Sequence, residues 1–337
     1  MTAVAADAER YLHLVGDGDE QGAVEVVAGL LAAGMPAQRV MVDLIAATQT
    51  RVGELWAANV WTVAREHAAT ATSERALAYV AAQCAVRPHR GRITIACVDG
   101  EWHALPARIL AEMLRLDGWR VDFLGPSVPG PHLVAHLHET GPDAVALSCM
   151  LATRLPRAHA AITACRAAGV PVIAGGRGFG PGGRYAQRLG ADVWAADAEE
   201  AVARLASSGP PSSPAEQDVL FGDDEYTFVV RERPSLIATT MSSLAATYPA
   251  VRAYDHRQLD ATLEDLGHIV DFLAAALYLR EPAIFTDFAE WTAAVLQARG
   301  VPPPALRAGI SSVRAQLTDF PRARSVLDAG LARLPAR

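Results

Sequence analysis

The sequence predicts an α/β fold flanked by all-helical segments, and three observations support this expectation. Residues 1–88 and 219–337 carry apolar side chains at helical spacing, whereas residues 89–208 alternate short β-rich runs with helical runs. The stretch SSGPPSSP at residues 207–214 has the composition of a linker. We therefore expect a four-helix-bundle cap, a doubly wound sheet of the Rossmann or flavodoxin type, a linker at residues 209–218 and a C-terminal helical domain.

The composition is that of a globular protein. Hydrophobic residues make up 51% of the 337, but no apolar run approaches the roughly 20 residues that cross a bilayer. Met1 is followed by an acidic, alanine-rich segment rather than by a signal peptide, so we expect a cytoplasmic protein. The four cysteines show no CxxC spacing, and no disulfide framework is indicated.

The charged residues exclude two kinds of chemistry. The formal net charge is −7 and the basic residues form no block, so we expect no direct contact with nucleic acid. All 30 basic residues are arginine. A Schiff base to retinal or pyridoxal phosphate requires a lysine side chain and is therefore impossible.

The N-terminal segment predicts four short helices, with a turn at Gly34-Met35-Pro36. The apolar positions that recur at helical spacing are Val24, Val27, Leu30, Leu31, Val40, Leu44 and Ile45, with Thr48 continuing the pattern. Further along, nine residues separate Trp56 from the pair Glu66-His67. Without further context, this stretch predicts a buried tryptophan and a solvated Glu–His pair.

The central segment predicts five strand–helix units and hence a right-handed, doubly wound parallel sheet. The expected strands are residues 92–98, 121–124, 144–148, 170–174 and 193–195. The expected helices lie near residues 107–117, 130–140, 156–168, 182–189 and 199–206. No eight-fold strand–helix repeat is present, which argues against a radical enzyme with a substrate barrel.

A loop with one histidine follows the first expected strand. Open α/β sheets bind ligands at the carboxyl ends of their strands, and this loop contains Glu101 and His103. The carboxylate can polarise the imidazole from two positions away. By itself such a histidine is most often an ordinary surface residue. Two further features follow downstream, Ser148-Cys149-Met150 and Gly175-Gly176-Arg177.

The glycine-rich run at residues 175–180 permits a second interpretation. It is similar to a dinucleotide-binding loop, with Asp197 near the position expected for an acid that binds ribose. However, the run follows the fourth expected strand rather than the first. This placement favours a role in binding another nucleotide-like group.

Together these features resemble the cobalamin-binding domain pattern Asp/Glu-x-His-x-x-Gly, Ser-x-Leu and Gly-Gly. The resemblance implies that His103 is the lower ligand to cobalt and that Glu101 supports it. It also implies that the displaced nucleotide tail enters a slot lined by Ser148, Met150, Gly175, Gly176 and Arg177. Two residues depart from the pattern: Pro106 replaces the glycine, and Met150 replaces the leucine.

The N-terminal motif extends this resemblance. Trp56-x9-Glu66-His67 is similar to the signature of the CarH-like adenosylcobalamin-dependent light sensors. The resemblance implies that Trp56 packs against the adenosyl group and that Glu66 accepts hydrogen bonds from ribose hydroxyls. Those sensors carry a second histidine after the tryptophan, where this chain has Ala57. The stable bis-histidine state of those sensors then requires that His67 or another group substitutes.

The C-terminal segment predicts five or more helices separated by prolines. Its clearest stripe is expected to be buried and comprises Leu259, Leu263, Leu266, Val270, Leu273 and Leu277. Asp265 and His268 lie beside this stripe, and a half-exposed histidine on an amphipathic helix is the simplest interpretation.

A helical tail after a cobalamin module resembles the globin-like bilin-binding domain of the photocobilins. The resemblance implies non-covalent biliverdin, because no cysteine follows Cys165. Asp265 and His268 are then the candidate partners of the pyrrole nitrogens. The further candidates around the bilin are Arg231, Arg233, Arg252, Tyr254 and Arg257. Heme with His268 as its ligand fits the sequence as well.

We therefore expect a light sensor rather than a turnover enzyme. Adenosylcobalamin and biliverdin are its expected chromophores, and we expect a homo-oligomer whose association responds to light, with an unidentified output partner. The main alternative is a corrinoid methyl carrier of a methyltransferase system. A cobalamin sensor with a heme-binding tail is the third hypothesis.

Overall fold

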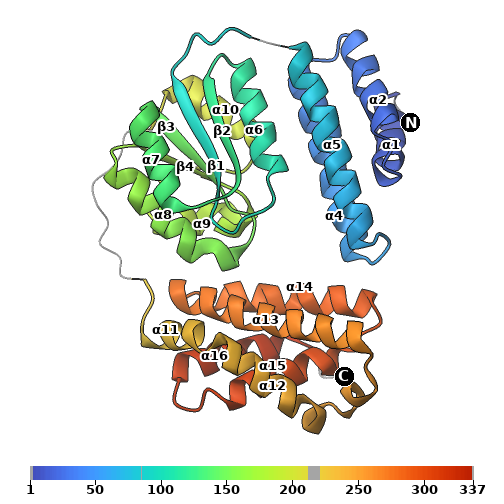
Figure 1. Cartoon of the computed structure of the whole chain (residues 1–337), viewed down its shortest axis with the longest axis vertical. Helices are drawn as coiled ribbons and strands as arrows, with labels where there is room; N and C mark the ends of the chain where they lie inside the picture. Colours follow the sequence, from blue (N-terminus) through green and yellow to red (C-terminus); the bar gives the residue numbers. More distant parts are fainter. Residues whose placement is uncertain (1–2, 85, 212–220, 336–337) are drawn as a thin grey trace. The chain divides into compact units, whose positions relative to one another are not determined.

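The computed structural model describes residues 3–84, 86–211 and 221–335. The chain divides into two compact units, residues 1–217 and 218–337, which are described separately here (Figure 1). Most of the expected linker at residues 209–218 lies outside the described residues. No helix in the described ranges is long and apolar enough to cross a membrane.

The first unit begins with a helical cap, as the sequence predicts. Its helices are α1 (Ala3–Gly16), α2 (Glu20–Ala32), α3 (Ala37–Arg39), the π-helical η1 (Val40–Ala46), α4 (Ala47–Ala57) and α5 (Val63–Gln83). Helices α3, η1 and α4 run on continuously, because the residues at both junctions have helical backbone angles. Asp19 and Thr62 cap α2 and α5 by accepting hydrogen bonds from backbone N–H groups of the first turn.

A parallel sheet follows the cap. Its strands are β1 (Arg92–Val98), β2 (Arg120–Val128), β3 (Ala144–Ser148), β4 (Val172–Gly175) and β5 (Val193–Ala195). Their order is β2-β1-β3-β4-β5, which is the flavodoxin-like arrangement. The helices are α6 (Leu105–Leu116), α7 (Gly130–Thr140), α8 (Leu155–Ala167), α9 (Arg184–Arg188) and α10 (Ala198–Ser208). Helices α6 and α10 cover one face, while α7 and α8 cover the other (Figure 1).

The expected strands agree with the structure at β1, β3 and β5 and need correction at β2 and β4. Strand β4 begins two residues later than expected. Strand β2 continues beyond its expected end at Leu124, because the Gly125-Pro126 pair forms a bulge rather than a terminating turn. The pairing of β1 with β2 shifts register on both sides of Ala96 and resumes where Val98 pairs with Val128.

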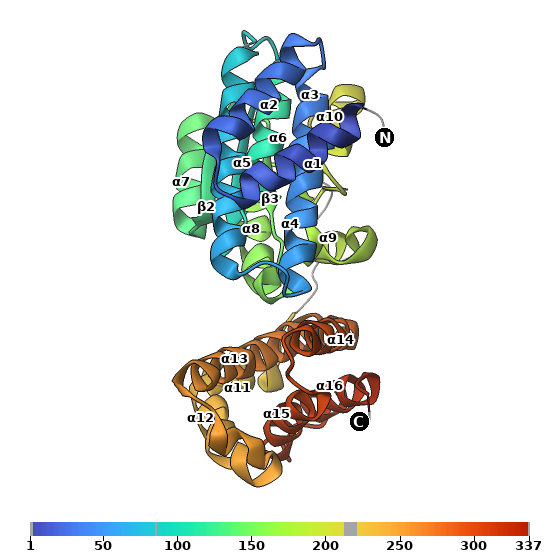
Figure 2. The same ribbon diagram turned by 90° about the vertical axis from the view of Figure 1, so that its right-hand side faces the viewer.

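The cap shares a hydrophobic core with helix α6, whereas the strands belong to a second core cluster. Buried cap residues such as Val27, Met41 and Ile45 belong to the same cluster as Leu105, Ile109 and Met113 of α6. Helix α6 lies between the cap helices and the sheet (Figure 2). A helix that begins directly after the histidine loop is therefore packed against the cap.

The second unit consists of helices only. They are α11 (Asp224–Arg231), α12 (Arg233–Thr247), the 3₁₀ turn η5 (Pro249–Ala253), α13 (His256–Leu279), α14 (Pro282–Ala298), α15 (Pro303–Ala315) and α16 (Pro321–Arg333). Proline in the first turn begins most of them. Asp255 and Gln258 form a reciprocal capping box at the start of α13. The fully buried Leu273, Phe285 and Ile310 give this unit its own core.

The predicted buried stripe on α13 is wrong at one position. Leu266, Val270, Leu273 and Leu277 are buried, but the Leu263 side chain is 41% exposed. A step of four residues rotates about 40° beyond a full helical turn, which moves Leu263 to the edge of the stripe. Leu259 is partly buried against Leu244, Val251 and Ala308.

Candidate functional site

The candidate site lies where β1 and β3 end. These strands are neighbours in the sheet, although β2 intervenes in the sequence. Ligands of open α/β sheets bind at such a reversal of strand order, outside the carboxyl ends of the strands. The loop after β1 carries Glu101 and His103, and the loop after β3 carries Met150 and Leu151. Glu101 joins the two loops.

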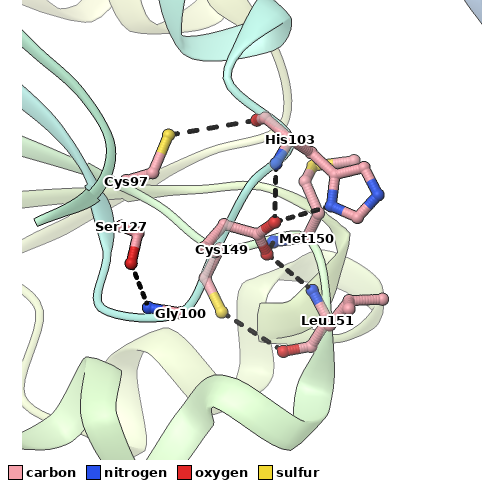
Figure 3. A network of polar contacts seen from close by, with 8 residues as sticks. Cys97, Gly100, His103, Ser127, Cys149, Met150 and Leu151 are labelled. Carbon is pink, nitrogen blue, oxygen red and sulfur yellow. Dashed lines mark hydrogen bonds and ion pairs between the residues drawn. The ribbon is translucent and has the colours of Figure 1, made fainter. Parts of the chain in front are cut away.

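The Glu101 carboxylate is completely buried and accepts four hydrogen bonds (Figure 3). Oε1 accepts from the backbone N of His103 at 2.9 Å and from His103 Nδ1 at 2.6 Å. Oε2 accepts from the backbone N atoms of Met150 at 2.7 Å and Leu151 at 3.2 Å. Burial by itself raises the pKa of Glu101, but the hydrogen bonds from His103 and Met150 outweigh it and lower this pKa to about 2.

This carboxylate determines the state of the imidazole. An ionised carboxylate only accepts hydrogen bonds, so the proton of a neutral His103 ring lies on Nδ1 and Nε2 carries a lone pair. The hydrogen bond to Glu101 is also the main cause that raises the pKa of His103. The His103 side chain is 56% exposed. Its Nε2 is thus prepared to bind a metal centre from outside the loop.

Two buried thiols support the loops from behind. Cys97 Sγ donates to the backbone O of His103 at 3.9 Å, and Cys149 Sγ donates to the backbone O of Leu151 at 3.4 Å. Ser148 is also buried, and its side chain bonds to Cys97. Burial raises the pKa of both thiols, that of Cys97 to about 12, so they remain protonated donors. Met150 takes part through its backbone, and its replacement of leucine leaves that contact unchanged.

The glycine run lies against the β3 loop. Gly176 has φ +104°, and a Cβ there would lie 2.3 Å from the backbone O of Cys149. A Cβ at Gly178 would lie 2.9 Å from the same oxygen, whereas the closest atom to a Cβ at Gly175 is 3.7 Å away. Gly176 and Gly178 are therefore the positions of this run where a side chain would meet the β3 loop, while a Cβ at Gly180 would meet Tyr185. Sequence reasoning missed Gly178, although the Gly-x-Gly repeat was the signal that could have found it.

The structure also locates two further residues that the sequence analysis considered, Arg177 and Asp197. Arg177 is exposed. Asp197 caps α10, where its side chain accepts from the backbone N of Glu200 at 2.8 Å. Its carboxylate thus has a local role that does not require a dinucleotide.

The cap motif faces the same region. Trp56 is half-buried in the last turn of α4, and Glu66 is half-buried in the first turn of α5. Glu66 Oε1 accepts from Thr70 at 3.0 Å, and its Oε2 pairs with His67 Nδ1 at 2.8 Å. The negative charge of Glu66 contributes to raising the pKa of His103. Glu66 is therefore within electrostatic range of the loop histidine. His67 itself is 73% exposed.

The described part of the first unit leaves several large apolar side chains exposed. They include Val60 in the α4–α5 connection, Val63 at the start of α5, Trp102 in the loop after β1 and Leu151 in the loop after β3. Trp102, next to His103, is 71% exposed. Trp102 and Leu151 both adjoin Glu101, Trp102 in the sequence and Leu151 through its backbone hydrogen bond, and exposed apolar side chains at such a place are typical of a binding surface. A cavity of about 300 Å³ lined by Cys84, Arg115 and Trp119 lies elsewhere, near the amino end of β2, away from the ligand-binding edge.

In the second unit the predicted site residues lie apart. Asp265 and His268 are one turn apart on α13. Asp265 is half-buried, and burial raises its pKa, opposed by the positive charges of His268 and Arg299. Along the helix axis Arg257 lies about 16 Å from His268, and Arg252 precedes it in η5.

The other candidate side chains of the second unit have protein partners. Arg233 binds Asp271 through two hydrogen bonds of 2.6 and 2.9 Å, and Arg231 pairs with Glu232 at 2.9 Å. Tyr254 makes an edge contact with Tyr248. Asp265 and His268 thus lie one turn apart on α13, and Arg233 lies against the same helix at Gly267 and Asp271. Arg252 and Arg257 lie further away, before and at the start of that helix.

Comparison with known proteins identifies two matched regions in the first unit. One B12 binding domain model matches residues 91–206, and a second B12 binding domain model matches residues 7–81. The first covers the sheet with its two ligand-side loops. The second covers most of the cap, including Trp56 and Glu66.

Individual relatives fall into two groups. The HTH-type transcriptional repressor CarA of Myxococcus xanthus is 36% identical over 138 residues, which is 37% of this chain and 47% of the repressor. Dimethylamine corrinoid protein 3 of Methanosarcina mazei is 30% identical over 118 residues, which is 34% of this chain and 70% of that protein. The chain spans about half the length of the first curated relatives that it matches.

One solved structure shares the fold of the first unit. The monomethylamine corrinoid protein of Methanosarcina barkeri matches with a TM-score of 0.51 and 19% identity, over 58% of this chain and 94% of that one. This likeness concerns the fold alone: a helical cap beside a Rossmann-like parallel sheet. With both B12 binding models matched and the corrinoid relative covered over most of its length, the chain belongs to the family of B12-binding corrinoid proteins.

Proposed function

We propose that this protein is an adenosylcobalamin-dependent light sensor in which His103 is the lower ligand to cobalt. The observation that carries the proposal is the bond between His103 Nδ1 and the buried Glu101, because it leaves Nε2 with a lone pair on an exposed ring. Adenosylcobalamin, when bound, supplies a cobalt–carbon bond that light cleaves. The chain supplies the lower cobalt ligand, the surface that binds the cofactor and the structural change that follows illumination.

The residues on the sheet side fit a corrinoid. The exposed apolar residues Trp102 and Leu151 offer a surface to the flat macrocycle beside His103. Gly176 and Gly178 keep the β3 and β4 loops close together, and a side chain at either would fill that contact. Ser148 lies behind the same loops. We assign these positions to the nucleotide tail.

The cap residues fit the upper face. The Trp56 indole is a large flat surface for an adenosyl group, and the Glu66 carboxylate can accept hydrogen bonds from its ribose hydroxyls. Cap and α6 share a core, and α6 begins two residues after His103. A loss of contacts at Trp56 therefore changes the packing of a cap that is mechanically connected to the ligand loop. We propose this rearrangement, and a resulting change in self-association, as the output.

The test is an absorption spectrum of the full chain loaded in the dark with adenosylcobalamin, taken before and after green light. We expect a histidine-ligated spectrum that light converts irreversibly, together with a light-dependent change in elution volume on size exclusion. His103→Ala should lose the histidine-ligated spectrum. The exposed His138 of α7 provides the control, because His138→Ala should retain it. A dark spectrum of the wild-type chain without histidine ligation would contradict the proposal.

A corrinoid methyl carrier is the second candidate. It is favoured by the fold match to the monomethylamine corrinoid protein and by the match to dimethylamine corrinoid protein 3. A carrier should bind methylcobalamin at least as tightly as adenosylcobalamin and should keep its elution volume under light. Parallel titrations with the two cobalamins separate the candidates.

For the second unit we propose a non-covalent biliverdin held near Asp265 and His268. Support comes from the half-burial of Asp265 one turn from His268 on α13, and from the lack of cysteine after Cys165. Biliverdin should give the full chain a broad red band that Asp265→Asn or His268→Ala removes. The exposed His256 at the start of α13 serves as the control variant. A sharp Soret band after incubation with heme, without a red band from biliverdin, would identify a heme sensor instead.

The remaining proposals concern partners and location. We propose a cytoplasmic homo-oligomer that binds small-molecule chromophores and contacts neither DNA nor a membrane directly. The net charge of −7 supports the lack of nucleic-acid binding. This chain matches 47% of the Myxococcus repressor, so that protein's role as a repressor does not extend to this chain. A mobility-shift assay with random duplex DNA in dark and light tests this point.

A further inference from the structure

The end of β2 contains a residue in an unusual backbone conformation. Ser127 has φ +50°, in the left-handed region that residues other than glycine rarely adopt. The other two described residues of this kind, Asn59 and Arg280, lie just after the carboxyl ends of helices, where left-handed residues are common. Ser127 instead lies within a strand. Such a conformation costs free energy and persists where the surroundings hold it.

Two hydrogen bonds hold Ser127 against the histidine loop. Its Oγ accepts from the backbone N of Gly100 at 3.0 Å (Figure 3). Its backbone N donates to the backbone O of Glu101 at 2.8 Å. One serine therefore satisfies a donor and an acceptor on consecutive residues of the loop. Gly100 itself has φ +78°, so the turn between β1 and His103 is tight.

The bulge in β2 explains how Ser127 reaches this loop. The register shifts between β1 and β2 begin after Ile95 and end where Val98 pairs with Val128. Gly125, with φ +84°, allows the backbone to turn, and the extra residues bring Ser127 beside Gly100. The bulge is thus the feature that sequence analysis missed, and it carries the contact to the ligand loop.

We propose that Ser127 is a positioning residue for the cobalt ligand. Its two bonds fix the backbone of Gly100 and Glu101, Glu101 fixes Nδ1 of His103, and Nδ1 sets the direction of Nε2. This inference rests on the proposed role of His103 and adds a third residue to the Glu101–His103 pair. Ser127 acts through the backbone of Gly100 and Glu101.

Three substitutions separate the hydroxyl from the backbone strain. Ser127→Ala removes the acceptor and keeps the strained φ. Ser127→Gly removes the acceptor, relieves the strain and keeps the N–H donor. Ser127→Asn restores an acceptor on a residue that tolerates the left-handed region. Ser207→Ala is the matched control, because Ser207 donates to the backbone O of Arg204 on the exposed side of α10, away from the loop.

The experiment uses the full chain, titrated in the dark with adenosylcobalamin, with the histidine-ligated fraction read from the absorption spectrum over a pH series. Losing one net hydrogen bond should weaken binding about five-fold in Ser127→Ala and Ser127→Gly. Both variants should also show a smaller fraction of histidine-ligated cobalamin. As the pH falls, they should lose the histidine ligand at a higher pH than wild type does. Ser127→Asn and Ser207→Ala should match wild type.

The outcomes separate this inference from the proposed function. Unchanged affinity and ligated fraction in Ser127→Ala and Ser127→Gly, with loss in His103→Ala, would overturn the role of Ser127 and leave His103 as the ligand. Lower melting temperatures with an unchanged spectrum would likewise assign Ser127 to the fold alone. If wild type itself shows no histidine ligation, the proposed function fails first and the positioning role fails with it.

Discussion

Nδ1 of His103 lies 2.6 Å from Oε1 of the fully buried Glu101, and the other carboxylate oxygen accepts from the backbone of the neighbouring strand's loop. A single carboxylate thus sets the tautomer of an exposed imidazole and joins the two loops at the ligand-binding edge of the sheet. Each carboxylate oxygen accepts two hydrogen bonds from the protein, which hold the carboxylate in the orientation that His103 requires. The first two predictions follow from this arrangement.

Glu101→Gln should weaken cobalamin binding about 10- to 100-fold, the usual effect of losing the residue that orients a metal ligand. The amide offers one acceptor oxygen where the carboxylate offers two, so either His103 or the Met150 loop loses its partner. Titration of the full chain with adenosylcobalamin in the dark measures the change. Glu54→Gln is the control, because Glu54 is an exposed residue of α4 that pairs with Arg51. Equal affinities for both variants would contradict the role of Glu101.

The Glu101–His103 pair should also make folding stability depend on pH. The pKa of Glu101 falls from 4.5 to about 2 on folding, so its contribution is complete above pH 4.5 and is lost as the pH falls towards 2. The pKa of His103 is raised from 6.5, so its contribution is complete below pH 6.5 and is lost at higher pH. We therefore expect the pair to stabilise the fold most between these two values. The Glu101 contribution is of the order of 3 kcal/mol.

Urea unfolding of wild type and Glu101→Gln between pH 2 and pH 8 checks this dependence. The difference in unfolding free energy between the two proteins should be largest near pH 5 to 6 and shrink towards pH 2. A difference that stays constant across the acid range would show that the carboxylate charge contributes nothing to stability.

Gly176→Ala should destabilise the first unit by about 3 kcal/mol, since it combines a left-handed backbone with a clash against main-chain atoms. The new Cβ would lie 2.3 Å from the backbone O of Cys149. Gly175→Ala is the matched control with 3.7 Å of clearance and should cost less than about 1 kcal/mol. Urea unfolding compares the two. Equal losses would mean that the β3 and β4 loops can separate without cost.

The sequence predicted those parts of the site that are local in the chain. The ends of β1, β3 and β5 agree with expectation, and Glu101 lies next to His103 in the loop. The contacts missed are distant in sequence: the Met150 bond to Glu101 crosses 49 residues, and the Ser127 bond to Gly100 crosses 27. Gly125-Pro126 has the composition of a turn, and only pairing with β1 shows that it is a bulge. Leu263 was wrongly predicted to be buried, because the spacing of apolar residues along a helix does not show which of them lie at the exposed edge of the apolar face.

The last prediction distinguishes the two tryptophans of the site. Trp56 belongs to the cap and is half-buried, whereas Trp102 is exposed beside the proposed lower ligand. If the cap holds an adenosyl group, Trp56→Ala should weaken adenosylcobalamin about ten-fold through lost apolar contact and change methylcobalamin little. Trp102→Ala should weaken both cobalamins alike, because its contacts lie on the side that they share.

Dark titrations of both variants with the two cobalamins give the comparison directly. The ratio of the two affinities is the informative quantity, because general damage to the fold lowers both affinities and cancels in it. A ratio that changes only in Trp56→Ala places the upper group against the cap and supports a sensor built around adenosylcobalamin. A ratio unchanged in both variants would mean that the cap does not distinguish the upper groups, and the methyl-carrier function would then be the better account of the same fold.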